Sequence, residues 1–217
     1  MSLPVTVLVA ILLAACGQAP APSVALISQA DAVEFDPTPA AARKFRPTLT
    51  REARLVWGLD APIPMLAAQL HQESGWDPNA RSAVGAGGLA QFMPSTAADY
   101  PDGSGRVDVY NPDWAIRAQS RYLRDLYARV SYPRECDRLG AALSAYNGGL
   151  GWHNRRQRTA NDRGDPTDFW AGVRVINPGV TAANQRENEE YPIKIIDRWQ
   201  GRYGHWGRTV CLERTPA

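Results

Sequence analysis

Residues 60–75 read DAPIPMLAAQLHQESG, and their spacing of apolar and polar positions predicts an amphipathic helix. Asp60 is a residue type that can cap such a helix. Pro62 and Pro64 would then fall in the first turn, where a missing backbone N–H costs least. We therefore expect a helix that begins just after Asp60 and runs to about Glu73.

The apolar stripe of this helix ends in a carboxylate. Leu66, Gln69, Leu70 and Glu73 recur at the spacing of one helical face. Burial against apolar surface removes hydration from a carboxylate, which raises its pKa and lets it stay protonated near neutral pH. Glu73 is therefore a candidate general acid. His71 lies on the other side, and no HExxH zinc pattern surrounds it, so we expect no metal here.

Further helix signals follow along the chain. Asn111-Pro112-Asp113 is typical of a helix start. A second helix is expected over 134–146, ending at the Asn147-Gly148-Gly149 break, and a third over 184–199. These signals predict a mainly α fold with a helical core, built as a single domain over 46–217.

The N-terminal residues 1–15 form one apolar run without a charged side chain. A membrane span needs about 20 apolar residues, so this run fits a cleaved signal peptide better. The small residues before Cys16 resemble a lipobox, which predicts that Cys16 carries a lipid anchor. Because no Lys or Arg precedes the run, an ordinary secretory signal or an uncleaved anchor is the alternative.

The segment after the signal, residues 16–45, is rich in Ala and Pro and has no sustained apolar period. This composition predicts a flexible tether, which as a coil typically spans ~30 Å. That reach would let an anchored domain contact a nearby cell wall.

Cys136 and Cys211 are the cysteines that remain if Cys16 carries lipid. Export delivers a chain to an oxidising compartment, where we expect a disulfide between them. The alternative is a pair of free thiols. No metal-type spacing links either cysteine to a histidine, so neither a metal nor another cofactor is expected.

The net charge of +2 is too small to favour nucleic-acid binding. A local basic cluster contains Arg155, Arg156, Arg158 and Arg163. Its default explanation is a solvated helix face, and the alternative is attraction to an anionic polymer such as peptidoglycan.

Four blocks together resemble the soluble-lytic-transglycosylase-like (SLT) catalytic domain of the lysozyme-like superfamily. The first two, ESGWDPNARS over 73–82 and GLAQFMPSTA over 88–97, follow the family pattern of ES, a glycine-rich turn and GLMQ-x-MP. Ala90 and Phe92 depart from it by apolar exchanges. AYNGG over 145–149 and the later Glu187-x-x-x-Tyr191 match the remaining blocks.

This resemblance implies a lysozyme-like fold with a substrate groove and a single catalytic glutamate. Glu73 would protonate the oxygen between N-acetylmuramic acid and N-acetylglucosamine and later take the proton of the C6 hydroxyl, leaving a 1,6-anhydro sugar. The 2-acetamido group of the substrate would replace an enzyme nucleophile. Ser74 would orient Glu73, and Tyr146 would approach Glu73 across the cleft by hydrogen bonding.

The resemblance also implies a set of groove residues that bind glycan. These are Ser82, Gln91, Met93, Asn147, Trp152, Glu187 and Tyr191. Trp57, Trp76 and Trp170 are more readily explained as core residues.

Two other functions remain open from the sequence. A lysozyme-type hydrolase would need a second carboxylate to activate water or trap the sugar, and Asp77, Asp99 and Asp102 are the candidates. A non-catalytic peptidoglycan-binding protein would not depend on Glu73 at all.

The expected partners are peptidoglycan strands and, through the lipid, a membrane, with the protein acting as a monomer. We expect export to the periplasm with anchoring at the outer membrane. A bacteriophage endolysin that uses host export is the alternative origin.

Overall fold

The computed structural model describes residues 38–211, which all belong to one compact unit. The predicted signal peptide, Cys16 and the tether up to residue 37 lie outside the described residues. Within 38–211, no helix combines the length and apolar character needed to cross a bilayer.

The described residues are mainly helical and contain no strand, which confirms the predicted fold class. The helices are α1 (Ala40–Trp57), α2 (Ile63–Ser74), α3 (Pro94–Ala97), α4 (Pro112–Arg129), α5 (Glu135–Gly148), α6 (Leu150–Arg163), α7 (Trp170–Arg174) and α8 (Ala182–Ile193). Within the described residues, the π-helical η2 (Lys194–Trp199) and the 3-10 helix η3 (Gln200–Trp206) follow α8.

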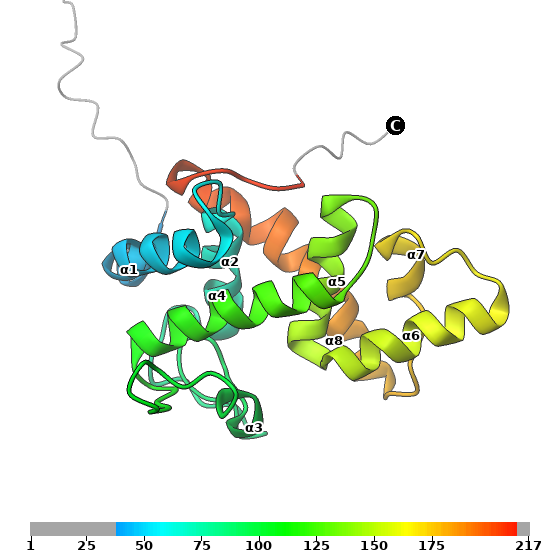
Figure 1. Ribbon diagram of the computed structural model, residues 1–217, viewed down its shortest axis with the longest axis horizontal. Coiled ribbons are helices and arrows are strands. Elements are labelled where there is room, and N and C mark those ends of the chain that lie inside the picture. Colours follow the sequence, from blue (N-terminus) through cyan, green and yellow to red (C-terminus); the bar gives the residue numbers. More distant parts are fainter. Residues whose placement is uncertain (1–37, 212–217) are drawn as a thin grey trace, which may run out of the picture. The chain divides into compact units, whose positions relative to one another are not determined.

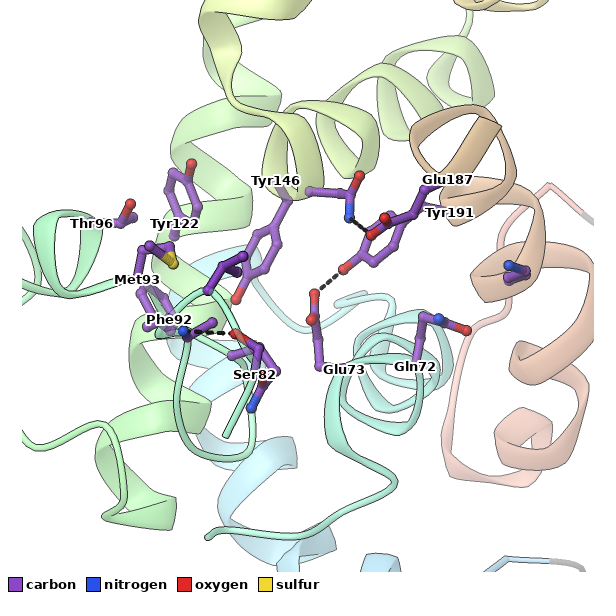
Figure 2. Close-up of a pocket in the computed structure, with 15 residues that line it drawn as sticks. Gln72, Glu73, Ser82, Phe92, Met93, Thr96, Tyr122, Tyr146, Glu187 and Tyr191 are labelled. Atoms are coloured by element: carbon purple, nitrogen blue, oxygen red, sulfur yellow. Dashed lines mark hydrogen bonds between the residues drawn. The ribbon is translucent and has the colours of Figure 1, made fainter. Parts of the chain in front are cut away.

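Helix α4 connects the two sides of the domain (Figure 1). It packs against α1 at one end and against α5 at the other, and α5 in turn contacts α6, α7 and α8. Helix α2 packs against α1, η2 and η3. The end of α2, where Glu73 is located, therefore lies where α1 and α2 approach the group formed by α5, α6, α7 and α8 (Figure 2).

Helix α1 begins at Ala40, so the predicted tether boundary at residue 45 is wrong. Ala42, Phe45 and Leu49 are buried, and the Phe45 ring stacks on Trp76 with ring centroids 6.3 Å apart. These apolar residues recur along one helical face and anchor the helix to the core. Burial of this face extends the folded domain into the Ala-rich segment.

Helix α2 begins later than the sequence suggested. Its N-cap is Pro62, which has no side-chain cap, and its first turn is held by Met65 and Leu66 N–H groups that donate to the Pro62 carbonyl. The expectation that Asp60 caps this helix is therefore wrong. The helix ends at Ser74, and its C-cap Gly75 has a φ of 60°, which lies in the left-handed region that favours glycine.

The other predicted helices form with adjusted ends. The Asn111 side chain caps α4 by accepting from Asp113 N and Trp114 N, as its position indicated. Helix α5 continues through Gly148, where an added Cβ would lie 2.6 Å from the Trp152 ring. Beyond Pro192, which lacks a backbone N–H, the last predicted helix widens into the π-helical η2.

A disulfide joins Cys136, in the first turn of α5, to Cys211, with Cα atoms 5.4 Å apart. This is the pairing expected from the sequence. It ties the segment after η3 to α5, on residues that do not line the cavity described below.

The expectation of a solvated basic cluster is wrong for Arg156, which is only 1% exposed. Its guanidinium donates to the Ile176 carbonyl at 3.0 Å, to Gln185 Oε1 at 2.8 Å and to Asn188 Oδ1. The contacts with Gln185 and Asn188 hold α6 to α8, so this arginine is structural. Arg158 and Arg163 are exposed.

Candidate active site

A cavity of about 350 Å³ lies between α2, the 82–93 loop, α4, α5 and the α8–η2 segment (Figure 2). Its lining combines apolar and polar side chains, which is typical of ligand sites. The lining residues are Gln72, Glu73, Ser82, Val84, Ala86, Gln91, Phe92, Met93, Thr96, Tyr122, Tyr146, Asn147, Glu187, Tyr191 and Lys194.

Glu73 projects into this cavity from the last turn of α2, as Figure 2 shows. Desolvation raises the pKa of its carboxyl to about 8, the hydrogen bond from Tyr191 opposes that rise, and the negative charge of Glu187 adds to it. The carboxyl group is therefore mainly protonated at neutral pH. A carboxylic acid in this state can act as a proton donor.

The hydrogen-bond partner of Glu73 is Tyr191, whose hydroxyl donates to Glu73 Oε1. From the sequence we expected this partner to be Tyr146, and that expectation is wrong. The Tyr146 hydroxyl donates instead to the Ala90 carbonyl at 2.9 Å, while its ring packs against Tyr122 with centroids 4.9 Å apart. Tyr146 still borders the cavity, and burial raises its pKa well above the usual value, so it is neutral.

Ser74 does not orient Glu73. Its hydroxyl is within hydrogen-bond distance of two backbone carbonyls, Leu89 O at 2.8 Å and Leu70 O at 3.3 Å. The contact with Leu89 fastens the 82–93 loop to the end of α2. The side chain contributes to the site through the loop that it holds.

The 82–93 loop depends on a close backbone approach at Gly88. Its φ is +76°, and an added Cβ would lie 1.7 Å from the Val109 carbonyl oxygen. Gln91, at a φ of 46°, donates from Nε2 to the Gly88 carbonyl at 2.9 Å and to the Ala80 carbonyl at 3.3 Å. Ser82 Oγ accepts from Ala86 N at 2.9 Å. Both polar side chains therefore shape the loop as well as line the cavity.

The opposite wall joins α5 to α8. Asn147 Nδ2 donates to Glu187 Oε1 at 3.2 Å, and Asn147 Oδ1 accepts from Asn188 Nδ2 at 2.8 Å. Met93, which is 39% exposed, lies at the other side of the cavity (Figure 2). Of the predicted groove residues, only Trp152 does not line the cavity, because its ring packs beside Gly148 at the end of α5.

Residues 55–169 match the family of the Transglycosylase SLT domain. The chain belongs to this family. It is 38% identical over 141 residues to a membrane-bound lytic murein transglycosylase F of Maricaulis maris, covering 63% of this chain and 30% of that relative. It is 36% identical over 170 residues to a protein of the same name from Yersinia enterocolitica, covering 72% of this chain and 32% of the relative.

Two solved structures share the fold of this SLT domain. They are an inactive mutant of the lytic transglycosylase Slt of Pseudomonas aeruginosa, with a TM-score of 0.56 and 24% identity, and the 70 kDa soluble lytic transglycosylase of Escherichia coli, with 0.53 and 22%. Each likeness covers 75% of this chain, and 25% and 24% of those chains. The chain thus spans about a third or less of the length of the relatives it matches.

Several lining residues of the SLT domain were not found from the sequence. They are Gln72, Val84, Ala86, Phe92, Thr96, Tyr122 and Lys194. Gln72 precedes Glu73 and Thr96 follows Met93 by three positions, so nearness to a motif was a usable signal. Lys194 follows Tyr191 by three positions in the same way. Tyr122 carries no such signal, because tertiary packing alone brings it to the cavity.

The proposed second carboxylates Asp77, Asp99 and Asp102 do not line the cavity. Asp77 Oδ1 accepts from Asn79 N at 2.8 Å. Asp102 accepts from Ser104 and Arg106, whose hydrogen bonds lower its pKa to about 2. Glu187 is the one other carboxylate among the described lining residues. Within 38–211, no group of three or more His, Cys, Asp or Glu side chains is arranged to hold a metal ion.

Proposed function

We propose that this SLT domain is a lytic transglycosylase that cleaves the β-1,4 bond between N-acetylmuramic acid and N-acetylglucosamine in peptidoglycan. The observation that carries the proposal is Glu73, a carboxyl group in a cavity with a pKa raised to about 8 by desolvation. Family membership and the similarity to lytic murein transglycosylases support the same substrate class.

The reaction begins with protonated Glu73, which donates its proton to the glycosidic oxygen as that bond breaks. The 2-acetamido oxygen of the muramic acid residue stabilises the positive charge that develops at C1. The carboxylate left on Glu73 then takes the proton of the C6 hydroxyl, and O6 bonds to C1. The product is a 1,6-anhydro sugar, and the glutamate ends as it began, protonated.

Tyr191 can assist the second step of this reaction, in which Glu73 acts as the base. Its hydroxyl donates to Glu73 Oε1, and such a donor stabilises the carboxylate that forms after the first proton transfer. Desolvation favours the acid at the start, and the hydrogen bond favours the base that follows. A pKa near neutrality allows one group to serve both steps.

The glycan would lie along the two walls of the cavity. Gln91, Ser82 and Met93 would contact it from the loop, and Asn147 and Glu187 from α5 and α8. In this role Ser74 acts indirectly, by holding the loop on α2.

The test is mass spectrometry of the muropeptides released from purified peptidoglycan by the protein and by Glu73→Gln. Anhydro-muropeptides that are absent with the variant support the proposal. Reducing-end products would indicate a hydrolase, for which Glu187 is the lining carboxylate to replace next. No release by either protein, over a range of pH, would indicate a binding protein.

We also propose that the chain is exported to the periplasm through residues 1–15 and anchored at the outer membrane by lipid on Cys16, with the residues before α1 as the tether. The relatives' names describe membrane-bound proteins, which supports a membrane location. Radiolabelled palmitate should label the expressed protein and not Cys16→Ser. Equal labelling of both would contradict the anchor. Recovery of unlabelled wild type as a soluble protein would instead favour an ordinary secretory signal, which a phage endolysin also uses.

A further inference from the structure

A chain of buried hydrogen bonds continues behind the Tyr191–Glu73 contact. The Tyr191 oxygen accepts from Gln69 Nε2 at 3.2 Å, and Gln69 Oε1 accepts from Gln119 Nε2 at 2.7 Å. Gln69 lies on α2 and Gln119 on α4, and both are 0% exposed. Burying two glutamine side chains completely carries a desolvation cost, so their arrangement calls for an explanation.

The direction of this chain is fixed at its far end. Gln119 Nε2 also donates to the Leu66 carbonyl at 3.2 Å, and a backbone carbonyl can only accept. The Gln119 amide must therefore turn its NH₂ group toward α2, where its second hydrogen meets Gln69 Oε1. Gln69 is left with its own NH₂ group facing Tyr191.

The phenol hydroxyl of Tyr191 has a single hydrogen. Because its oxygen accepts from Gln69, that hydrogen is directed to the remaining partner, the Glu73 carboxyl oxygen. The three hydrogen bonds from Gln119 to Gln69, from Gln69 to Tyr191 and from Tyr191 to Glu73 are thus all donated in the direction of Glu73. The Leu66 carbonyl therefore determines the direction in which Gln119, Gln69 and Tyr191 donate their hydrogen bonds, up to the candidate acid.

We infer that Gln69 and Gln119 are positioning residues for Glu73, which act through Tyr191 by fixing its hydroxyl hydrogen on the Glu73 carboxyl group. The arrangement favours the carboxylate form, since protonated Glu73 would need an acceptor while the Tyr191 oxygen is already engaged. Without it, Tyr191 could turn to accept from the protonated acid. The inference rests on the proposed function only in giving this effect a catalytic purpose.

The other ionisable groups that line the cavity with Glu73 come from α4, α5, α8 and η2. Tyr122, Tyr146 and Tyr191 are neutral, because burial raises their pKa values. Lys194, from η2, pairs with Glu190 at 2.8 Å. Glu187, from α8, raises the pKa of Glu73 by its charge. Apart from Tyr191, through which the chain acts, none of these groups hydrogen-bonds to Gln69 or Gln119.

The test is an NMR titration of the Glu73 carboxyl carbon in ¹³C-labelled protein without substrate, with the signal assigned by its loss in Glu73→Gln. Gln69→Met keeps an unbranched side chain of similar length and removes the donor to Tyr191. We expect it to raise the pKa of Glu73 by about 0.5 to 1 unit, and Gln119→Met to raise it by less.

Gln200→Met is the matched control. Gln200 is also 0% exposed and hydrogen-bonds to Val210 at both its amide atoms, at 2.8 and 2.9 Å, outside the chain to Glu73. Its loss should lower stability and leave the Glu73 titration unchanged. An unchanged titration in folded Gln69→Met, or an equal rise in Gln200→Met, would overturn the inference.

If Gln69→Met does not fold, Gln119→Met decides in the same way: a raised pKa supports the inference and an unchanged pKa overturns it. The titration needs no turnover. A protein that releases no anhydro-muropeptides would therefore refute the proposed function while leaving this inference measurable, and the two failures are distinguishable.

Discussion

Tyr191 on α8 donates a hydrogen bond to Glu73 on α2, although 118 positions separate the two residues in the chain. This contact joins the two groups of helices at the cavity (Figure 2). It also opposes the desolvation that raises the pKa of Glu73. The balance between these two effects determines when Glu73 can give and when it can take a proton.

Tyr191→Phe should shift this balance toward the protonated acid. Removing the donor raises the pKa of Glu73 above about 8 and leaves the carboxylate intermediate less stable. We expect kcat for muropeptide release to fall by about tenfold or more and the alkaline limb of the pH profile of kcat/KM to move to higher pH. Tyr132→Phe, whose hydroxyl contacts Gln157 away from the cavity, is the control. Identical pH profiles for the two variants would contradict the assignment of Tyr191.

Glu187→Gln should move the alkaline limb of the pH profile of kcat/KM to lower pH. The negative charge of Glu187 raises the pKa of Glu73, so its removal lowers that pKa and the enzyme loses its acid form at lower pH. Because Glu187 is exposed, the shift should shrink as salt is added. pH profiles at low and high ionic strength measure both effects. An alkaline shift would be inconsistent with this electrostatic role.

Stability should depend on pH through the same carboxyl group. Glu73 holds its proton up to about pH 8 in the folded protein, against a usual value of 4.5, so the folded state binds more protons between these values. The free energy of unfolding therefore falls as pH rises through that window. Because the Glu73 side chain is half-buried and solvent screens part of the effect, we expect the free energy of unfolding to fall by an amount on the order of 2 kcal/mol.

Glu73→Gln isolates this contribution, because glutamine can still accept from Tyr191 and does not ionise. The stability difference between the variant and the parent, measured by urea unfolding, should be small near pH 5 and favour the variant near pH 8. If the unfolding free energies of the parent and the variant changed with pH in parallel, burial would not destabilise the ionised Glu73 carboxylate.

Gly88→Ala should damage the loop that carries Gln91. The added Cβ would lie 1.7 Å from Val109 O, at a φ of +76° that L side chains rarely adopt. We expect a loss of about 3 kcal/mol or more in unfolding free energy, together with lower cleavage activity. Gly103→Ala, where an added Cβ has no neighbour within 4 Å, should change stability by less than about 1 kcal/mol. Comparable losses in both would argue against the close approach at Gly88.

Local pattern was sufficient to predict α2, α4, α5 and α8 and the position of the acid. The stripe ending in Glu73 and the cap at Asn111 depend on residues a few positions apart, and both appear as expected. The start of α1 at Ala40 was missed because composition alone does not show that Ala42 and Phe45 have a core to pack against.

The details of the site depend on distant contacts, and there the sequence was a poorer guide. Tyr146 and Tyr191 both carry hydroxyls that could reach Glu73, and only the packing of α8 against α5 determines which one does. Ser74 follows Glu73 directly, yet its hydroxyl contacts Leu89 O because a helix directs neighbouring side chains to different faces.

The most direct measurement is muropeptide release in water enriched in oxygen-18, followed by mass spectrometry of the new ends. An intramolecular attack by O6 brings in no solvent oxygen, so we expect 1,6-anhydro ends that carry no label and are absent with Glu73→Gln. Labelled reducing ends would contradict it, because they require water as the nucleophile and a second group to activate that water.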